Sequence, residues 1–568
     1  EVTPDGELRE HGLWTFTVRH SERFRDATLN ARLDVAARQR LDDQHLPSPT
    51  PGRFQADGGL RLGATAANSD WHSSAVVEAL GTSRGPFDEQ ERDGLALGYV
   101  RLDGGKGPWQ WTLGDQIPGQ PGLLVEPTLR RGVAAGFATD PLDLTLWSVR
   151  TPLAGGGSAL WTGNEERRTD GVTLTHRVFA DHPQRLTLSA SWLQGDGARG
   201  DGDLGSGMTA DPDAAAGQAG SLALQSWLFQ RRLHWQGEYA WSHRDGEETG
   251  EQTLDDENDS AYATQLTWYP LRQLKLANRP LALNLGLERR EVGPHFYSPV
   301  NPQQLTDHNL LGGFAGLHWA GVSLQAYGGH QDDNVDDNPL LADTELRQQS
   351  YSLGFAPSLA TPLPLLGQPS LSLSWQDNDQ RVTRSAALLD EGPLYRNRQL
   401  TGSAAFYYPA WSWDLSHSRG RDRAWQDLPV DLHTELSQLA LRLPVSQRLT
   451  LEPYGQYSRV MNRLQASDDS TLRQAGLTLG MQWHPRFWSS LTYTYGKRDL
   501  RNEPAQRLDD VQGSVQWQWR RPRGWVPGFN LSLGGQYFRQ PLLLTTSESR
   551  TGQWQVFAGI TASWATTP

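Results

Sequence analysis

The 568-residue chain contains no cysteine and only 3 methionines. Without cysteine there are no disulfides, no thiol catalysis and no Cys-ligated metal sites, and this composition fits an exported protein. The chain also lacks any run of about 18 consecutive apolar residues, the length that a transmembrane helix needs. Its net charge of -13 and the lack of a basic stripe with interleaved aromatic residues argue against nucleic acid as a partner.

What the chain has instead is a regular alternation between apolar and polar residues in short segments. In the last of these segments, apolar residues from Trp554 to Trp564 alternate with polar or small ones. A β-strand has a side-chain period of two, so each segment predicts a strand with one apolar face and one wet face. Only alternate residues then face lipid, which accounts for the mean hydropathy of -0.60. With 23 tryptophans, many of them at segment ends, the pattern predicts a transmembrane β-barrel.

The connections between these segments alternate between short and long. Short ones such as ATDP, WAG and HPRF follow long ones such as SHRDGEETGEQTLDDENDS, and outer-membrane barrels join their strands by tight periplasmic turns and longer external loops. Counting by this alternation predicts about 26 strands, an even number within the known range. The first strand holds Leu29 and Val35, and the last ends at Trp564. The connections near residues 270–280 and 357–369 are the weak points of the count, because both are long for periplasmic turns.

We therefore expect an all-β fold, a transmembrane antiparallel up-and-down β-barrel over residues 27–568. Residues 1–26 precede this barrel and include one more alternating stretch, with Trp14, Phe16 and Val18 on one face. This N-terminal segment is expected to be an extra strand, a plug or the remnant of an upstream domain.

The two faces of the expected strands predict two surfaces. Tryptophans near strand ends predict aromatic girdles at the two headgroup levels; the candidates are Trp192, Trp235, Trp241, Trp411, Trp413, Trp483, Trp488, Trp517, Trp519, Trp554 and Trp564. The opposite faces carry both signs of charge and many amides, which differs from the single-sign ladder of a strongly ion-selective pore. The lumen-lining candidates are Asn30, Arg32, Asp34, Arg38, His234, Gln236, Glu238, Gln512, Gln516 and Gln518.

On this pattern the chain resembles Gram-negative outer-membrane β-barrel channels over nearly its whole length. Its strand number is similar to that of the lipopolysaccharide-transport barrel, which a lipoprotein plugs, and to the porin sheath of multihaem electron conduits. The cysteines typical of both families are missing here. Exopolysaccharide exporters have a similar but smaller barrel. The region of Gly114, Asp115 and residues 130–132 faintly resembles the fimbrial usher.

The resemblance and the width together predict a function. A barrel of about 26 strands is wider than a porin of 16 to 18 strands that already holds a channel, so we expect something inside it: the N-terminal segment, long loops near residues 114–130, 195–219 and 289–309, or another protein. The expected function is a wide outer-membrane conduit, a gated or plugged export channel for polysaccharide or protein. The alternatives are a structural anchor or sheath that holds an adhesin or partner protein in its lumen and, third, a general diffusion porin.

Outer-membrane lipid, lipopolysaccharide and a plugging or periplasmic protein are the expected partners, and no cofactor or metal is expected. Enzyme activity is not expected either. The histidines, among them His234, His318 and His417, are scattered along the chain. No nucleophile elbow or metal-ligand histidine pair accompanies them.

Overall fold

The structure is a computed structural model of the whole chain. It describes residues 16–17, 26–44, 54–67, 71–82, 94–150, 168–198, 214–244, 248–249, 252–253, 257–271, 274–301, 304–358, 363, 367–386, 390–408, 410–426, 429–464, 469–501, 505–520, 528–539 and 553–564. In these residues nearly all regular structure is β, and no helix is long and apolar enough to span a membrane. Within the described residues, a 3-10 turn, Pro183–Arg185, lies between two strands.

The strands follow the alternating segments of the sequence, because each of these segments can bury one row of side chains and leave the other wet. In the first half of the chain they are β1 (Phe16–Thr17), β2 (Asp26–Gln44), β3 (Phe54–Ala67), β4 (Trp71–Thr82), β5 (Gly94–Lys106), β6 (Trp109–Gln116), β7 (Arg130–Ala138), β8 (Leu142–Arg150), β9 (Arg168–Arg177), β10 (Thr187–Ala198), β11 (Ala214–Leu228), β12 (Leu233–Arg244), β13 (Glu248–Thr249), β14 (Gln252–Thr253), β15 (Glu257–Trp268), β16 (Leu274–Leu276) and β17 (Arg279–Val292). In the second half they are β18 (His308–Trp319), β19 (Val322–Asp333), β20 (Asp343–Phe355), β21 (Gln368–Arg384), β22 (Gly392–Tyr408), β23 (Trp411–Ala424), β24 (Val430–Pro444), β25 (Leu449–Asn462), β26 (Ser470–His484), β27 (Phe487–Leu500), β28 (Gln506–Arg520), β29 (Gly528–Arg539) and β30 (Gln553–Trp564).

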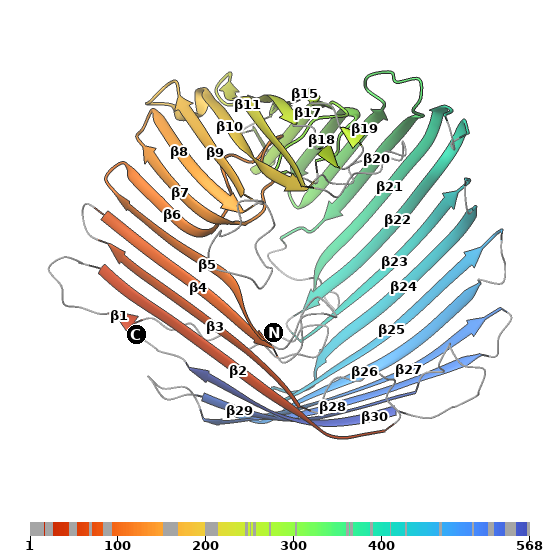
Figure 1. The fold of residues 1–568 in the computed structure, drawn as a ribbon. Coiled ribbons are helices and arrows are strands. Elements are labelled where there is room, and N and C mark those ends of the chain that lie inside the picture. The colour runs from red at the N-terminus through yellow and green to blue at the C-terminus, as the bar shows by residue number, and fades with distance from the viewer. Residues whose placement is uncertain are drawn as a thin grey trace.

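The main sheet contains 28 of these strands, of which β1 and β16 are short additions, so that 26 long strands remain. Each long strand pairs antiparallel with the next one along the chain. β30 pairs with β29 on one side and with β2 on the other, from Trp554↔Gln44 to Trp564↔Leu33. Figure 1 shows this arrangement of strands around a wide interior. The predicted all-β up-and-down fold and the predicted 26 strands are confirmed.

The two long connections that made the strand count uncertain contain extra local structure. Between β15 and β17, the short strand β16 folds back on the start of β17, with Leu274 opposite Leu281. Between β20 and β21, Leu363 and Gly367 form an isolated bridge. These additions lengthen the connections without adding a membrane-crossing strand, so the alternation of the sequence still gives the correct number of strands.

The tight connections at the same end use positive φ angles. In the two-residue link between β18 and β19, Ala320 has a φ of 51° and Gly321 a φ of 87°. Two central residues with positive φ match the twist of the flanking strands in a hairpin. At Gly321 a Cβ would lie 2.6 Å from the carbonyl oxygen of Ala356, so glycine is required there for its size as well as for its conformation.

At the start of the barrel, β1 pairs Phe16 with Leu29 and Thr17 with Thr28. The pairing of β2 with β30 begins only at Leu33, so β1 occupies the edge of β2 that β30 leaves open. Of the predicted N-terminal segment, the structure describes these two residues and the first residue of β2, and the remainder lies outside the described residues.

One face of the sheet carries large apolar side chains around the whole ring. Leu188, Leu222, Leu353 and Leu491 are exposed on it, and tryptophans and tyrosines lie nearer the strand ends. An apolar outer band with aromatic flanks is what the hydrocarbon core of a membrane requires of a barrel. The chain is therefore an outer-membrane β-barrel, with lipid on this face and its lumen on the other.

Candidate functional site

Two connections run along the inside of the barrel wall. The first comprises residues 117–129, between β6 and β7, and the second residues 293–307, between β17 and β18. We call these two segments together the inner lobe; of the second, residues 293–301 and 304–307 are described. The lobe lies against the inner face of the strands from β8 to β17 (Figure 1). These are two of the three loop regions expected to fold inward, and most of the third, near 195–219, lies outside the described residues.

The inner lobe has its own apolar core. Leu123, Leu124, Val125, Phe296 and Val300 are all at most 4% exposed. They pack with inward-facing residues of the wall: Trp147, Val149, Leu193, Ala219, Ala240, Ala261 and Val292. Burying a leucine-sized side chain stabilises by about 1.5 to 3 kcal/mol. The lobe is therefore fixed to the wall by packing and forms part of the folded barrel.

Hydrogen bonds join the two segments of the lobe to each other. Ser298 Oγ donates to the carbonyl oxygen of Leu124 at 2.6 Å, and Asn301 Nδ2 donates to that of Leu123 at 2.9 Å. The backbone amide of Glu126 donates to the carbonyl oxygen of Val300 at 3.3 Å. Buried backbone groups need such partners because water cannot reach them. The bonds cross between segments about 170 residues apart, as the 174-residue separation of Ser298 and Leu124 shows.

Carboxylates and a hydroxyl of the wall hold the lobe from the other side. Glu238 Oε2 accepts from the backbone amide of Leu123 at 2.8 Å. Asp259 Oδ2 accepts from the amide of His295 at 2.7 Å, and Ser242 Oγ from the amide of Tyr297 at 3.0 Å. A Cβ at Gly122 would lie 2.2 Å from Glu238 Oε2. Glycine at this position therefore allows the lobe to approach the wall.

Two arginines stand where the first lobe segment joins β7. Asp115 is fully buried and accepts from Arg131 Nε at 2.8 Å and from the backbone amide of Val100 at 2.8 Å. Arg130 is also fully buried and donates to the carbonyl oxygen of Val300 at 3.1 Å. Gly114 has a φ of 100°, and a Cβ there would lie 2.0 Å from the carbonyl oxygen of Val100. The cluster noticed in the sequence thus forms the base of the lobe.

On the other side of the barrel the inner wall carries cross-strand pairs of neutral polar groups. The pairs are Ser372 with Ser403 at 2.6 Å, Thr478 with Thr492 at 3.0 Å and Ser490 with Ser514 at 2.7 Å. Similar pairs occur on the wall beside the lobe, where Gln236 donates to Gln265 at 2.6 Å. Such a wall offers donors and acceptors of hydrogen bonds along its length.

The tip of the first lobe segment and the wall enclose a cavity of about 400 Å³. Polar side chains that contribute to its lining include Gln120, Thr187, Ser191, Gln225, Gln265 and Arg290. Arg290 donates to Gln304 Oε1 of the second lobe segment at 2.5 Å. In the part of the chain that the structure describes, no group of three or more His, Asp or Glu residues could hold a metal ion.

The predicted lumen-lining residues fall into three groups. Glu238 contacts the lobe, while His234 bonds to Gln225 at 3.1 Å and Gln236 to Gln265. Gln512, Gln516 and Gln518 lie together on one face of β28, opposite to that of Trp517. Asn30, Arg32, Asp34 and Arg38 lie in β2, and their side chains are outside the described residues. Of the first group, Glu238 bonds to the lobe, and the other two residues bond to neighbouring strands of the wall.

Most predicted girdle tryptophans share the outer apolar face. The exposed ones are Trp192, Trp235, Trp241, Trp483, Trp517 and Trp519. Trp411 and Trp413 lie on the face of the exposed Leu415. Trp488 pairs with Gln482 on one side and with Gln516 on the other, in the same alternation as Ser490, and so lies on the face of the polar row. Trp554 and Trp564 belong to β30, and their side chains are outside the described residues.

One feature of the sequence indicates the lobe: a stretch in which both faces of a strand are apolar. At one end of β8 to β17 both faces are apolar, as in the neighbouring residues Trp192 and Leu193, of which the first is exposed and the second fully buried. A lumen face should be wet along its whole length. An apolar stretch on that face therefore indicates that a segment of protein covers it.

Comparison with known proteins gives only distant matches. No protein-family model and no curated protein matches the chain. Among solved structures, the translocation pore of the P pilus usher PapC is 11% identical with a TM-score of 0.32, covering 95% of this chain and 99% of that chain. The copper transporter OprC is 10% identical with a TM-score of 0.40, covering 96% and 81%. Wzi of Escherichia coli, a carbohydrate-binding β-barrel, is 12% identical with a TM-score of 0.32, covering 61% and 80%. Matches at this level carry no argument about function.

Proposed function

We propose that this protein is a wide outer-membrane conduit for the export of a polar macromolecule, and that the inner lobe narrows its lumen. The observation that carries the proposal is the lobe itself. It is a folded element with a buried core, and it covers one side of the inner wall while the neutral polar wall opposite remains. A lumen of 26 strands is wider than that of a porin, and the lobe reduces this width without filling it.

The chemistry of the inner wall favours a hydrated, uncharged polymer as cargo. Rows of Ser, Thr and Gln can exchange hydrogen bonds with hydroxyl groups as well as with water. Strong ion selectivity would instead require rings of one charge. Of the two expected cargoes, polysaccharide and protein, these groups support the polysaccharide.

Single-channel conductance in planar bilayers tests the proposal. In the lobe-open variant, residues 118–128 are replaced by a short Gly-Ser linker, so that Asp115 and Arg131 stay in place. We expect a several-fold higher conductance than for the unchanged chain, because the removed segment stands inside the lumen. Liposomes that carry either protein and are challenged with neutral dextrans of increasing size should show a higher size limit for the variant.

The double substitution of Ser372→Ala and Ser403→Ala on the opposite wall is the matched control, and it should leave the conductance unchanged. A lobe-open variant that folds and still conducts no more than the unchanged chain would refute narrowing by the lobe. If both proteins also remained closed to small dextrans, the result would favour the alternative of a structural anchor or sheath that conducts nothing.

A further inference from the structure

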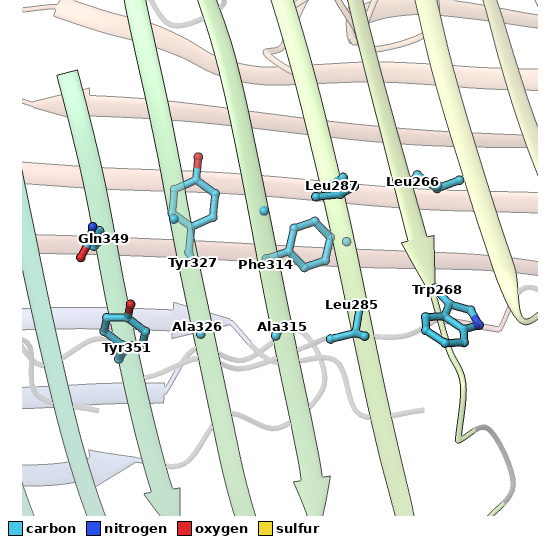
Figure 2. Close-up of a pocket in the computed structure, with 13 residues that line it drawn as sticks. Leu266, Trp268, Leu285, Leu287, Phe314, Ala315, Ala326, Tyr327, Gln349 and Tyr351 are labelled. Atoms are coloured by element: carbon cyan, nitrogen blue, oxygen red, sulfur yellow. The ribbon is translucent and has the colours of Figure 1, made fainter. Parts of the chain in front are cut away.

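The outer face of the barrel has a groove of about 570 Å³ across β17, β18, β19 and β20. Its floor consists of Gly313, Ala315, Ala326 and Gly328. Figure 2 shows the larger side chains that border it, with Leu285 and Leu287 on one side and Tyr351 on the other. Leu287 is 63% exposed and Tyr351 is 51% exposed, so this groove opens on the face that carries the apolar band.

The strand register explains the groove. One row across the four strands runs Leu287, Gly313, Gly328 and Gln349, and the next runs Leu285, Ala315, Ala326 and Tyr351. Two neighbouring strands therefore contribute only hydrogen or methyl groups between strands with large side chains. A Cβ at Gly313 would lie 3.4 Å from Leu287 Cδ2, and a Cβ at Gly328 would meet no atom within 4 Å. The floor is open space on the lipid side of the sheet.

The next row toward the long connections is basic. In register it runs Arg289, Leu311, His330 and Arg347. Arg289 is 53% exposed and Arg347 is 56% exposed. The carboxylates that pair with this row are Glu291, Asp332 and Glu345, and they lie one row further from the groove; Asp332 Oδ1 is 2.8 Å from His330 Nε2. Moving outward from the groove, the surface thus changes from apolar to basic and then to acidic.

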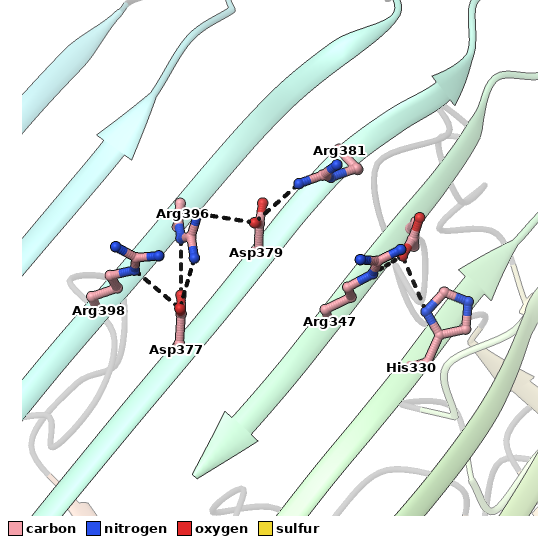
Figure 3. A network of polar contacts seen from close by, with 8 residues as sticks. His330, Arg347, Asp377, Asp379, Arg381, Arg396 and Arg398 are labelled. Atoms are coloured by element: carbon pink, nitrogen blue, oxygen red, sulfur yellow. Dashed lines mark hydrogen bonds and ion pairs between the residues drawn. The ribbon is translucent and has the colours of Figure 1, made fainter.

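The acidic residues beside this row on β21 have arginine partners of their own. On the next strand, Asp377 and Asp379 are held by three other arginines (Figure 3). Asp377 accepts from Arg396 at 2.7 Å and from Arg398 at 3.0 Å, and Asp379 contacts Arg381 at 3.2 Å. Arg396 also contacts Asp379 at 3.3 Å. Three arginines for two carboxylates leave this side of the row neutral or basic.

We propose that this groove and its basic row form a binding site for one lipopolysaccharide molecule of the outer leaflet. An acyl chain lies on the floor between Leu287 and Tyr351, and the two phosphates of the headgroup lie one at Arg289 and one at Arg347, which are three strand spacings of about 4.8 Å apart. The groove lies at the depth of the apolar band, where the acyl chain of a lipid must lie. The basic row lies directly beyond the groove, on the side of the long 334–342 connection, where the headgroup must be. Arginine is well suited to phosphate because its fork makes two parallel hydrogen bonds.

The shape of the groove favours one firmly held molecule over general contact with lipid. Elsewhere on the outer face, side chains such as Leu222 and Leu353 project from the wall. An acyl chain in the groove would contact protein on the floor and on both sides. More of its contacts with mobile neighbouring lipids would therefore be replaced by contacts with protein. Because Gly328 has open space above it, a larger residue there can fill the groove without disturbing the barrel. This makes the site testable.

Native mass spectrometry of the purified full chain in detergent, titrated with hexa-acylated bisphosphorylated lipid A in the presence of a chelator, tests the site. We expect one retained lipid A on the unchanged chain. Gly328→Leu, which fills the groove, should lower its affinity at least tenfold. The pair Arg289→Gln with Arg347→Gln should lower it by a similar factor, whereas dephosphorylated lipid A should bind this pair and the unchanged chain equally weakly.

Two variants serve as controls and should bind lipid A as the unchanged chain does. Gly455→Leu places a leucine on the outer face of a distant strand, where a Cβ would meet only the carbonyl oxygen of Gln474 at 4.0 Å. Arg442→Gln removes an exposed arginine near the other end of the barrel. If Gly328→Leu and the unchanged protein bound lipid A equally well, the proposal that the groove holds an acyl chain would be wrong. Equal binding of phosphorylated and dephosphorylated lipid A, or displacement by phosphatidylglycerol at similar concentration, would overturn the assignment to lipopolysaccharide.

Discussion

The inner wall of this barrel has two halves that differ, although their outer faces are alike. From β8 to β17 the inner face becomes apolar toward one end, and the inner lobe covers it there with a buried core and buried ion pairs. From β20 to β28 the described residues of the inner face form no such core, and serine and threonine side chains pair there across neighbouring strands. The strand pattern thus determines which face meets lipid, and the inner face is free to become either a support for a lobe or a wet wall.

This difference predicts unequal costs for the same kind of substitution. Arg131→Gln breaks the bidentate pair with Asp115, whose carboxylate is fully buried. Removing one partner of a buried ion pair costs about 3 to 5 kcal/mol, because the other charge stays buried without compensation. The urea midpoint of unfolding in detergent should fall accordingly, and residues 117–129 should become sensitive to protease.

Arg442→Gln is the matched change on the inner face of the uncovered half. Arg442 is 68% exposed and lies 3.3 Å from Glu452, and an exposed pair of this kind contributes about 0 to 1 kcal/mol. If the two arginine substitutions lowered the urea midpoint by the same amount, the conclusion that the ion pair of Asp115 with Arg131 is buried from water would be wrong.

The outer faces should respond alike in both halves. Leu188 lies on the outer face of β10 behind the lobe, and Leu479 on that of β26 in the uncovered half. An arginine on the lipid face costs about 2 to 4 kcal/mol near the bilayer midplane, so both leucine-to-arginine substitutions should destabilise the barrel by this amount. Refolding into lipid vesicles at increasing urea concentration measures it.

Gln516→Arg is the control on the inner face, where water can hydrate the new charge, and it should be tolerated. A cost for Gln516→Arg as large as that for Leu479→Arg would show that the two faces of the uncovered half are assigned the wrong way round.

The sequence was sufficient to predict which face of the strands is apolar and how many long strands there are. A period of two is a local property, so each segment shows its lipid face without knowledge of its neighbours. The first and last strands, around Leu29 and up to Trp564, were located in this way. The lobe could not be predicted in detail, because residues 117–129 have no periodicity and their partners, such as Ser298, lie far away in the chain. Trp488 shows a second limit: its position near a strand end predicts a girdle residue, but the alternation of its own strand through Ser490 and Thr492 places it on the polar face.

The smallest effect that still separates the two halves comes from removing one hydroxyl in each. Ser298 is 3% exposed, and its hydroxyl donates to the carbonyl oxygen of Leu124 inside the lobe. Ser298→Ala leaves that carbonyl buried with one donor fewer, which costs about 1 to 3 kcal/mol. Ser372→Ala removes a hydroxyl that bonds to Ser403 in the open lumen, where water replaces the lost partner, and surface changes of this kind stay within about 0.5 kcal/mol. Amide hydrogen exchange should therefore quicken in residues 117–129 of the first variant and stay unchanged around Ser403 in the second. Equal exchange in the two variants would mean that the lobe is as wet as the opposite wall, and the division of the lumen into a covered and an open half would fail.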